Sequence, residues 1–192
     1  MEVTQAILMT CTGLFVLQLF LGSFAPAFGM IPAAVARGEW WRLFTSTLLH
    51  NGLSHVAFNM LALYWLGPPM ERSLGPARFA ALYVLAGLGG SVASYWFSEL
   101  KTMSTGASGA LFGLIAAAIV LGRQIRADVS QLVALLGLNV VVGFVLPGID
   151  WRAHLGGAAT GAALAFTRNP VGIVVALGLA TLVRSAQIRQ LF

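Results

Sequence analysis

Long apolar runs, separated by short segments that carry charge, glycine or proline, dominate this sequence. The first run extends from Ala6 to Phe24 without a charged residue, which is enough helix to cross a bilayer. Further runs follow at Leu53–Leu66, Phe79–Phe97, Ala107–Leu121, Leu132–Val145 and His154–Phe166. Because lipid offers the backbone no hydrogen-bonding partner, such runs fold as helices. The pattern predicts an all-α, polytopic membrane bundle with six spanning helices.

Composition agrees with a membrane protein and excludes other classes. Hydrophobic residues make up 58% of the chain and charged residues 9%, far fewer than the roughly 25% of soluble domains. The net charge of +5 is spread over many short loops and forms no basic patch for nucleic acid. We expect an integral multi-pass protein whose surroundings are the lipid bilayer, with no nucleic-acid partner.

The first and last apolar runs could each be something other than a membrane-spanning helix. Ala25-Pro26-Ala27 resembles a signal-peptidase site, but the run before it lacks a preceding basic residue and exceeds the usual apolar core of about 7–15 residues. We expect this first helix to remain. A last apolar run at 171–183 is either a seventh crossing or a surface helix. Residues 1–192 are interpreted as one domain, with a core at about 6–167 and a hydrophobic tail at 171–183.

Charge orients the chain only weakly. A cytoplasmic N-terminus would place five basic residues inside, namely Arg72, Arg78, Arg123, Arg126 and Arg168. It would place four outside, namely Arg37, Arg42, Lys101 and Arg152. The positive-inside rule therefore favours a cytoplasmic N-terminus by five to four. The long loop from Pro26 to Asn51 mixes aromatic and charged residues, as is typical of the membrane interface.

A polar loop meets an apolar helix at Ser108. Small residues on both sides would let a substrate approach, and the first N–H groups of the helix have no intrahelical partner. The run beyond offers about 15 residues, or roughly 22 Å of helix, against a hydrocarbon thickness of about 30 Å. Ser108 should therefore lie below the membrane surface, as a nucleophile beside free donors.

All three histidines, His50, His55 and His154, stand near the start of an apolar run, where ionisable groups are costly and usually functional. His55 and Asn59 are spaced i, i+4, so they share a helix face and could stabilise an oxyanion. The alternative is an interhelical hydrogen bond without a catalytic role. His154 is the candidate base for Ser108. The histidine spacing and the single cysteine favour neither a metal site nor a cofactor.

Glycines indicate how Ser108 and His154 could meet. Two helices each carry a pair of glycines spaced four residues apart: Gly109 with Gly113, and Gly157 with Gly161. Such small-residue stripes let helices approach closely. Packing them together would bring His154 toward Ser108, and Phe112 would then support the imidazole ring.

Taken together, the motifs resemble those of the rhomboid intramembrane serine proteases. The matching residues are Trp41-Arg42, His55-x-x-x-Asn59, Gly67-x-x-x-Glu71-x-x-x-Gly75, Gly106-Ala107-Ser108-Gly109, and Ala153-His154 with Gly157 and Gly161. The resemblance implies a six-helix core, Ser108 as nucleophile, His154 as general base, and transmembrane proteins as substrates. It also implies a cytoplasmic N-terminus and an active site that opens outward. We expect the membrane to be a prokaryotic cytoplasmic membrane.

The same resemblance implies supporting roles for other residues. The oxyanion hole would comprise His55, Asn59 and the N–H of Ser108. The first loop would be braced by His50 and anchored by Trp41 and Arg42.

Three further segments would surround the site. Glu71 and Arg72 would hold the loop after the second span, while residues 147–152 would cap the site beside a substrate gate at the fifth span. The hydroxyl-rich segment from Ser98 to Thr105 either lines a path for water or, as we favour, lies in a solvated loop.

The principal alternative is a non-proteolytic rhomboid-like protein that binds transmembrane clients, which should lack the serine or the histidine. A transporter would explain intramembrane polar residues, but the chain shows no pair of similar halves. The natural substrate and the oligomeric state are not predicted by the sequence.

Overall fold

The computed structural model describes residues 1–145, 148–167 and 170–190, and the regular structure of this part of the chain is helical. The long helices are α1 (Glu2–Phe20), α5 (Leu53–Leu74), α6 (Pro76–Phe97), α7 (Ser108–Gln124), α8 (Ser130–Val145), α9 (Trp151–Phe166) and α10 (Val171–Arg189). The short ones are α2 (Phe24–Phe28), α3 (Pro32–Ala36), α4 (Arg42–Thr45) and the 3-10 helix η1 (Ser46–Leu48). The predicted all-α membrane bundle is confirmed.

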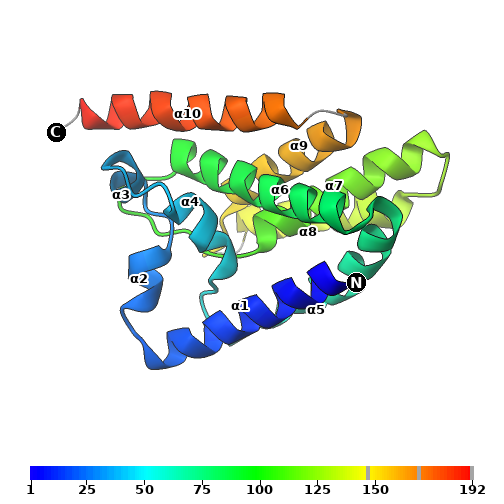
Figure 1. Cartoon of the computed structure of the whole chain (residues 1–192), viewed down its shortest axis with the longest axis horizontal. Coiled ribbons are helices and arrows are strands. Elements are labelled where there is room, and N and C mark those ends of the chain that lie inside the picture. The colour runs from blue at the N-terminus through cyan, green and yellow to red at the C-terminus, as the bar shows by residue number, and fades with distance from the viewer. Residues whose placement is uncertain (146–147, 168–169, 191–192) are drawn as a thin grey trace.

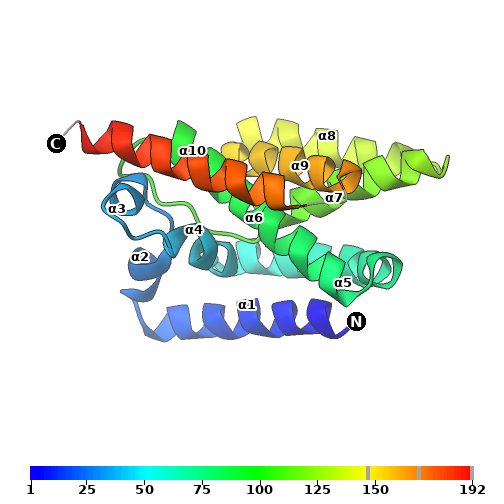
Figure 2. The ribbon, with the colours of Figure 1, turned by 45° about the horizontal axis from the view of Figure 1, so that its top comes forward.

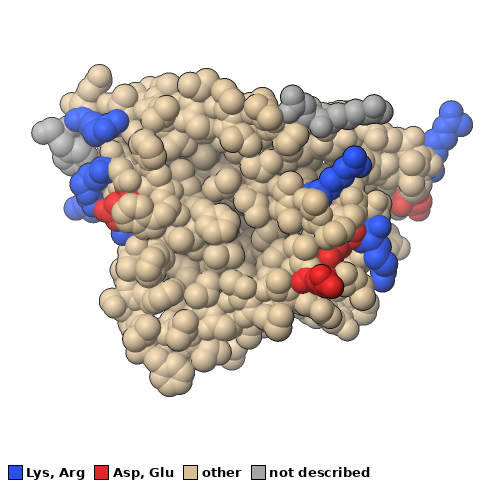
Figure 3. Space-filling view, viewed as in Figure 1, with Lys and Arg blue, Asp and Glu red and all other residues tan. Residues whose placement is uncertain are grey.

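Helices α1 and α10 lie on opposite sides of the bundle, with α6 and α7 between them (Figures 1 and 2). Among the described residues, α1, α6 and α10 are long and apolar enough to cross a membrane, while α7 and α8 are apolar but shorter. In the view of Figure 3, charged side chains gather toward the two ends of the long axis. The protein is therefore an integral membrane protein, and the run at 171–183 lies within a helix of spanning length.

Helix α5 is longer than the sequence predicts. Pro68 and Pro69 each remove a backbone donor, which predicts an end at Leu66, yet the helix continues to Leu74. Buried contacts in the last turns offset the loss of these backbone hydrogen bonds, because Met70 packs into a core shared with α6 and α7. Burial in the tertiary structure thus outweighs the local preference of the two prolines.

The end of α5 holds the start of α1. The Glu71 carboxylate, 3% exposed, accepts hydrogen bonds from the Val3 N–H at 3.1 Å, the Thr4 N–H at 2.9 Å and the Thr4 hydroxyl at 2.6 Å. These backbone donors have no partner within their own helix. An added Cβ at Gly67 would lie 2.6 Å from the Thr4 methyl group, so this position needs glycine. The expectation that Glu71 holds the loop after α5 is wrong, because it caps α1.

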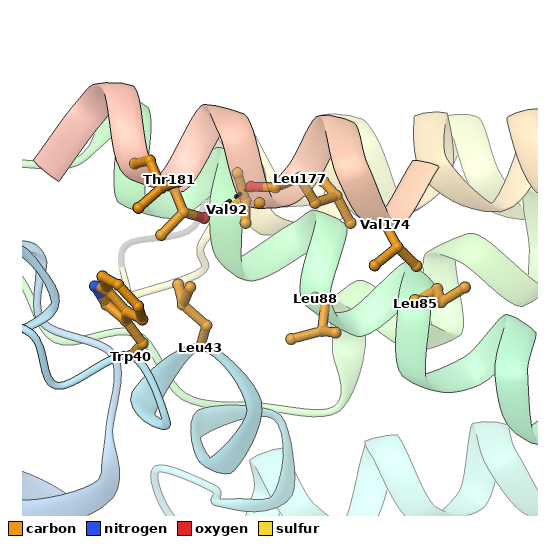
Figure 4. Close-up of a pocket in the computed structure, with 10 residues that line it drawn as sticks. Trp40, Leu43, Leu85, Leu88, Val92, Val174, Leu177 and Thr181 are labelled. Carbon is orange, nitrogen blue, oxygen red and sulfur yellow. Dashed lines mark hydrogen bonds between the residues drawn. The ribbon is translucent and has the colours of Figure 1, made fainter. Parts of the chain in front are cut away.

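Two apolar cores lie along α6. One joins α5, α6 and α7, with Phe79, Tyr83 and Leu114 at its centre. The other joins the segment before α5 to α6 and α10, through residues such as Tyr95 and Ile188. An apolar cavity of about 330 Å³ lies between α4, α6 and α10, and Figure 4 shows Trp40, Leu43, Leu85, Leu88, Val92, Val174, Leu177 and Thr181 around it. The helix α10 thus covers the first loop as well as α6.

Candidate active site

Ser108 and His154 lie together inside the bundle. Ser108 is the first residue of α7, and its Oγ lies 2.9 Å from Nε2 of His154 in the first turn of α9. The Phe112 ring stacks on the imidazole, with ring centroids 4.0 Å apart and planes inclined by 14°. Within the described part of the chain, Nδ1 of His154 has no hydrogen-bond partner. The geometry suits proton transfer between a hydroxyl and a histidine.

Backbone contact between α7 and α9 holds these two side chains at that separation. An added Cβ at Gly157 would collide with the carbonyl oxygen of Gly109, and one at Gly161 would collide with that of Gly113. The glycine stripes therefore face each other with no side chain between them. We call this contact of Gly109, Gly113, Gly157 and Gly161 the glycine seam. It fixes the relative height of Ser108 and His154 along the bundle.

His55 lies over the loop that leads to Ser108. An added Cβ at Gly106 would be 2.8 Å from Nε2 of His55 and 3.6 Å from Oγ of Ser108. Gly106 also has φ of +138°, a conformation that side chains rarely tolerate. Asn59 is buried, and one of its two amide N–H groups donates to the His55 carbonyl oxygen at 2.8 Å. The structure therefore brings His55, Gly106 and Ser108 together, with Asn59 one turn further along α5.

The first loop is tied down by a buried arginine. Arg42 donates hydrogen bonds to the carbonyl oxygens of Pro26 and Gly29, both at 2.8 Å, and its guanidinium lies 2.6 Å from the Glu39 carboxylate. The neighbouring Trp41 side chain is 53% exposed, so it does not pack inside the loop. Of this predicted pair, the structure buries only the arginine.

His50, near the end of the same loop, is buried, and its ring meets that of His55 edge-on with centroids 5.2 Å apart. Burial, together with the nearby His55, lowers the pKa of His50 to about 4. The Gln18 side chain of α1 binds the backbone of His50: it donates to the His50 carbonyl oxygen at 3.0 Å and accepts from the His50 N–H at 3.1 Å. Sequence reasoning missed Gln18, a lone polar residue in an apolar run.

Asp150 was also missed, since the sequence places it in a loop. Its Oδ2 accepts hydrogen bonds from the hydroxyls of Ser94 and Ser104, each at 2.5 Å, and Ser94 is 3.1 Å from the Ser98 hydroxyl. Ser98 is buried. The expectation of a solvated loop is therefore wrong for Ser98, whereas Ser104 is half-buried and Thr102 is exposed. Of the predicted cap at 147–152, residue 147 lies outside the described residues.

No group of three or more His, Cys, Asp or Glu side chains in the described ranges is arranged to hold a metal ion. The family model of the Rhomboid domain matches residues 37–170, most of the chain. The chain belongs to the rhomboid family. All the residues of the Ser108–His154 pair, the glycine seam and the His55 contact fall inside this rhomboid domain.

Similar rhomboid proteins come from two bacteria. The rhomboid protease GluP of Bacillus subtilis is 39% identical over 132 residues, 66% of this chain and 26% of GluP. YdcA of the same organism is 39% identical over 137 residues, 69% of each chain. The rhomboid protease AarA of Providencia stuartii is 34% identical over 154 residues, 65% of this chain and 54% of AarA. The similarity thus spans about a quarter of GluP and about half of AarA.

Proposed function

We propose that this rhomboid-family chain is an intramembrane serine endopeptidase with Ser108 and His154 as a catalytic dyad. The observation that carries the proposal is the 2.9 Å separation of Oγ and Nε2 inside a membrane bundle. His154 takes the hydroxyl proton as Ser108 attacks a peptide carbonyl, and then returns it to the leaving amine. Water hydrolyses the acyl-enzyme and frees Ser108. The relatives GluP and AarA, which are named rhomboid proteases, support this reaction class.

The negative charge of the tetrahedral intermediate would develop between His55 and the start of α7. The Ser108 N–H is one of the donors that a helix start leaves free. Nε2 of His55, close to Gly106, and the second amide N–H of Asn59 would complete the oxyanion hole. Removing one such donor typically costs about 2.7–4 kcal/mol of transition-state stabilisation. Gly109, Gly157 and Gly161 would act by holding α7 against α9, and Phe112 by orienting the imidazole.

The substrates we propose are transmembrane proteins, which reach the site from the lipid beside α8. A peptide bond must be extended to be cut, so substrate helices with glycine or proline near the cleavage point should unwind most readily. We further propose a prokaryotic cytoplasmic membrane, with the N-terminus in the cytoplasm and the site opening outward. The five-to-four excess of basic residues supports this orientation.

Labelling with a fluorophosphonate probe, which modifies activated serines, tests the dyad. The protein would be purified in detergent and compared with Ser108→Ala and His154→Ala, and mass spectrometry would locate the adduct. Ser130→Ala is the matched control, because Ser130 is also the first residue of a helix but is exposed. We expect one adduct, on Ser108, that both dyad variants lose and the control keeps.

Cleavage of a reconstituted transmembrane test substrate should follow the same pattern. A folded wild-type protein that neither takes up the probe nor cleaves would contradict the dyad. That result would favour the non-proteolytic, client-binding alternative.

A further inference from the structure

One carboxylate joins three separate parts of the chain that surround the dyad. Oδ2 of Asp150 accepts from the Ser94 hydroxyl at the end of α6 and from the Ser104 hydroxyl in the loop before α7, both at 2.5 Å. Oδ1 accepts from the Ala153 N–H in the first turn of α9, at 3.2 Å. Hydrogen bonds to a carboxylate are roughly twice as strong as those between neutral groups. Asp150 therefore links three elements at once.

From this arrangement we infer that Asp150 is a positioning residue, which sets the distance between Ser108 and His154 by tying the loop before one to the helix start of the other. The inference rests on the proposed serine-protease function. It assigns Asp150 no contact with the substrate or with the reacting atoms.

On the histidine side, the link is direct. Ala153, whose N–H Asp150 caps, immediately precedes His154, and the His154 N–H itself donates to the Asp150 carbonyl oxygen at 3.2 Å. The Ala153 carbonyl oxygen faces α6 and α7, where added Cβ atoms at Gly90 and Gly109 would lie 2.7 and 3.2 Å from it. The first turn of α9 is thus held by Asp150 on one side and by glycine backbones on the other.

On the serine side, the link runs through Ser104. Its backbone pairs with Met30 of the first loop in both directions, through N···O distances of 2.8 and 3.0 Å, and its hydroxyl reaches Asp150. The chain then has only three residues before Ser108. Without Asp150, Ser104 would keep its contact with the first loop but lose its contact with α9. The glycine seam alone would then hold α9 against α7, and the loop before Ser108 would have no direct tie to the helix start that carries His154.

Asp150 does not act as a third member of a catalytic triad. Its carboxylate oxygens bond to two serines and a backbone N–H, and Nδ1 of His154 has no hydrogen-bond partner among the described residues. A triad acid would need its negative charge, whereas a positioning residue needs only hydrogen bonds of the right geometry. Asparagine offers those, since its oxygen can cap Ala153 and its amide can donate to a serine hydroxyl.

The test measures kcat and KM for a transmembrane test substrate in liposomes, with wild type, Asp150→Ala and Asp150→Asn. A misplacement of about 1 Å costs about 100-fold, so Asp150→Ala should lower kcat by about that factor. KM should stay within about twofold, because substrate binding is untouched. Asp150→Asn should recover most of the rate. Tyr95→Phe is the matched control, since it removes a buried 2.8 Å hydrogen bond between α6 and α10 without touching the dyad.

Each outcome decides the matter. Folded wild-type protein that neither takes up the fluorophosphonate probe nor cleaves the substrate would overturn the proposed function and this inference with it. An active wild type with an unchanged Asp150→Ala rate, or with Asp150→Asn as slow as Asp150→Ala, would overturn the positioning role alone.

If Asp150→Ala lacks a thermal unfolding transition, Ser104→Ala replaces it. That variant removes one charge-assisted hydrogen bond, so kcat should fall by about tenfold. An unchanged rate would overturn the positioning role.

Discussion

Helices α8 and α9 follow one another in the chain and are both 16 residues long, yet the bundle holds them differently. In α9, the buried residues are His154, Gly157 and Gly161, on the face toward α7. In the described part of α8, Gly143 alone is buried, and large apolar side chains such as Leu138 and Phe144 are exposed. The base of the proposed dyad thus sits on a helix fixed by backbone contact, beside a helix that exposes its large apolar side chains.

The difference shows how a membrane protein can keep its catalytic residues in fixed positions while another helix of the bundle remains able to move aside for a substrate. In the glycine seam, backbone atoms touch backbone atoms, and no side chain can change its rotamer to absorb a shift. The position of α7 therefore fixes the position of α9. Side chains that face lipid lose little when their helix shifts, because lipid replaces the protein contacts with equally apolar ones. Under the proposed function, a substrate helix that enters beside α8 would displace it without disturbing Ser108 and His154.

The largest effect is expected from Gly157→Ala in α9, which removes the close backbone contact that distinguishes α9 from α8. The new methyl group would collide with the Gly109 carbonyl oxygen, which is backbone and cannot rotate away. Overpacking of this kind costs about 1–3 kcal/mol and should push α9 off α7. We expect the rate of fluorophosphonate labelling at Ser108 to fall by about 100-fold. Labelling at the wild-type rate would mean that the seam does not position the dyad.

A smaller effect is expected from Phe144→Leu, which loosens α8 from α9. Phe144 stacks on Trp151 with ring centroids 4.6 Å apart, and such pairs contribute about 0.5–1.5 kcal/mol. Cleavage of a transmembrane substrate should rise by up to about tenfold, while labelling by the small probe stays the same. Comparing the two rates in the same preparation checks this. A parallel fall in both would show that α8 supports the dyad.

The smallest effect belongs to Gly137→Ala, the counterpart of Gly157→Ala in α8. A Cβ at Gly137 would meet no atom within 4 Å. Alanine is favoured over glycine in a helix by about 1 kcal/mol, so the thermal unfolding midpoint in detergent should rise slightly. Cleavage should be unchanged. A loss of activity comparable to that of Gly157→Ala would remove the distinction between the two helices.

Features that repeat along the chain were predictable from the sequence. Apolar runs gave the helical membrane bundle, although α1 begins earlier than the predicted Ala6 and α9 begins three residues before His154. The spacing of the glycines and histidines predicted that Ser108 and His154 meet, and the structure places them in contact, although their catalytic roles stay predictions.

What the sequence could not give are contacts without a local pattern. The carboxylate of Asp150 meets a serine 56 positions away, and Gln18 meets His50 32 positions away. Glu71 lies next to α1 only because α5 continues through Pro68 and Pro69. Each depends on which helices become neighbours, and a single polar residue, whether in an apolar run like Gln18 or in a loop like Asp150, carries no signal of that.

The glycine seam also limits how this sequence can drift over generations. In an ordinary apolar core, a larger residue on one helix can be offset by a smaller one opposite, so pairs of positions change together. Gly109 faces Gly157 and Gly113 faces Gly161, each through its carbonyl oxygen, and glycine has no side chain left to give up. No second substitution can restore the fit. Descendants of this chain should therefore keep Gly157 and Gly161 while the lipid-facing positions of α8 vary.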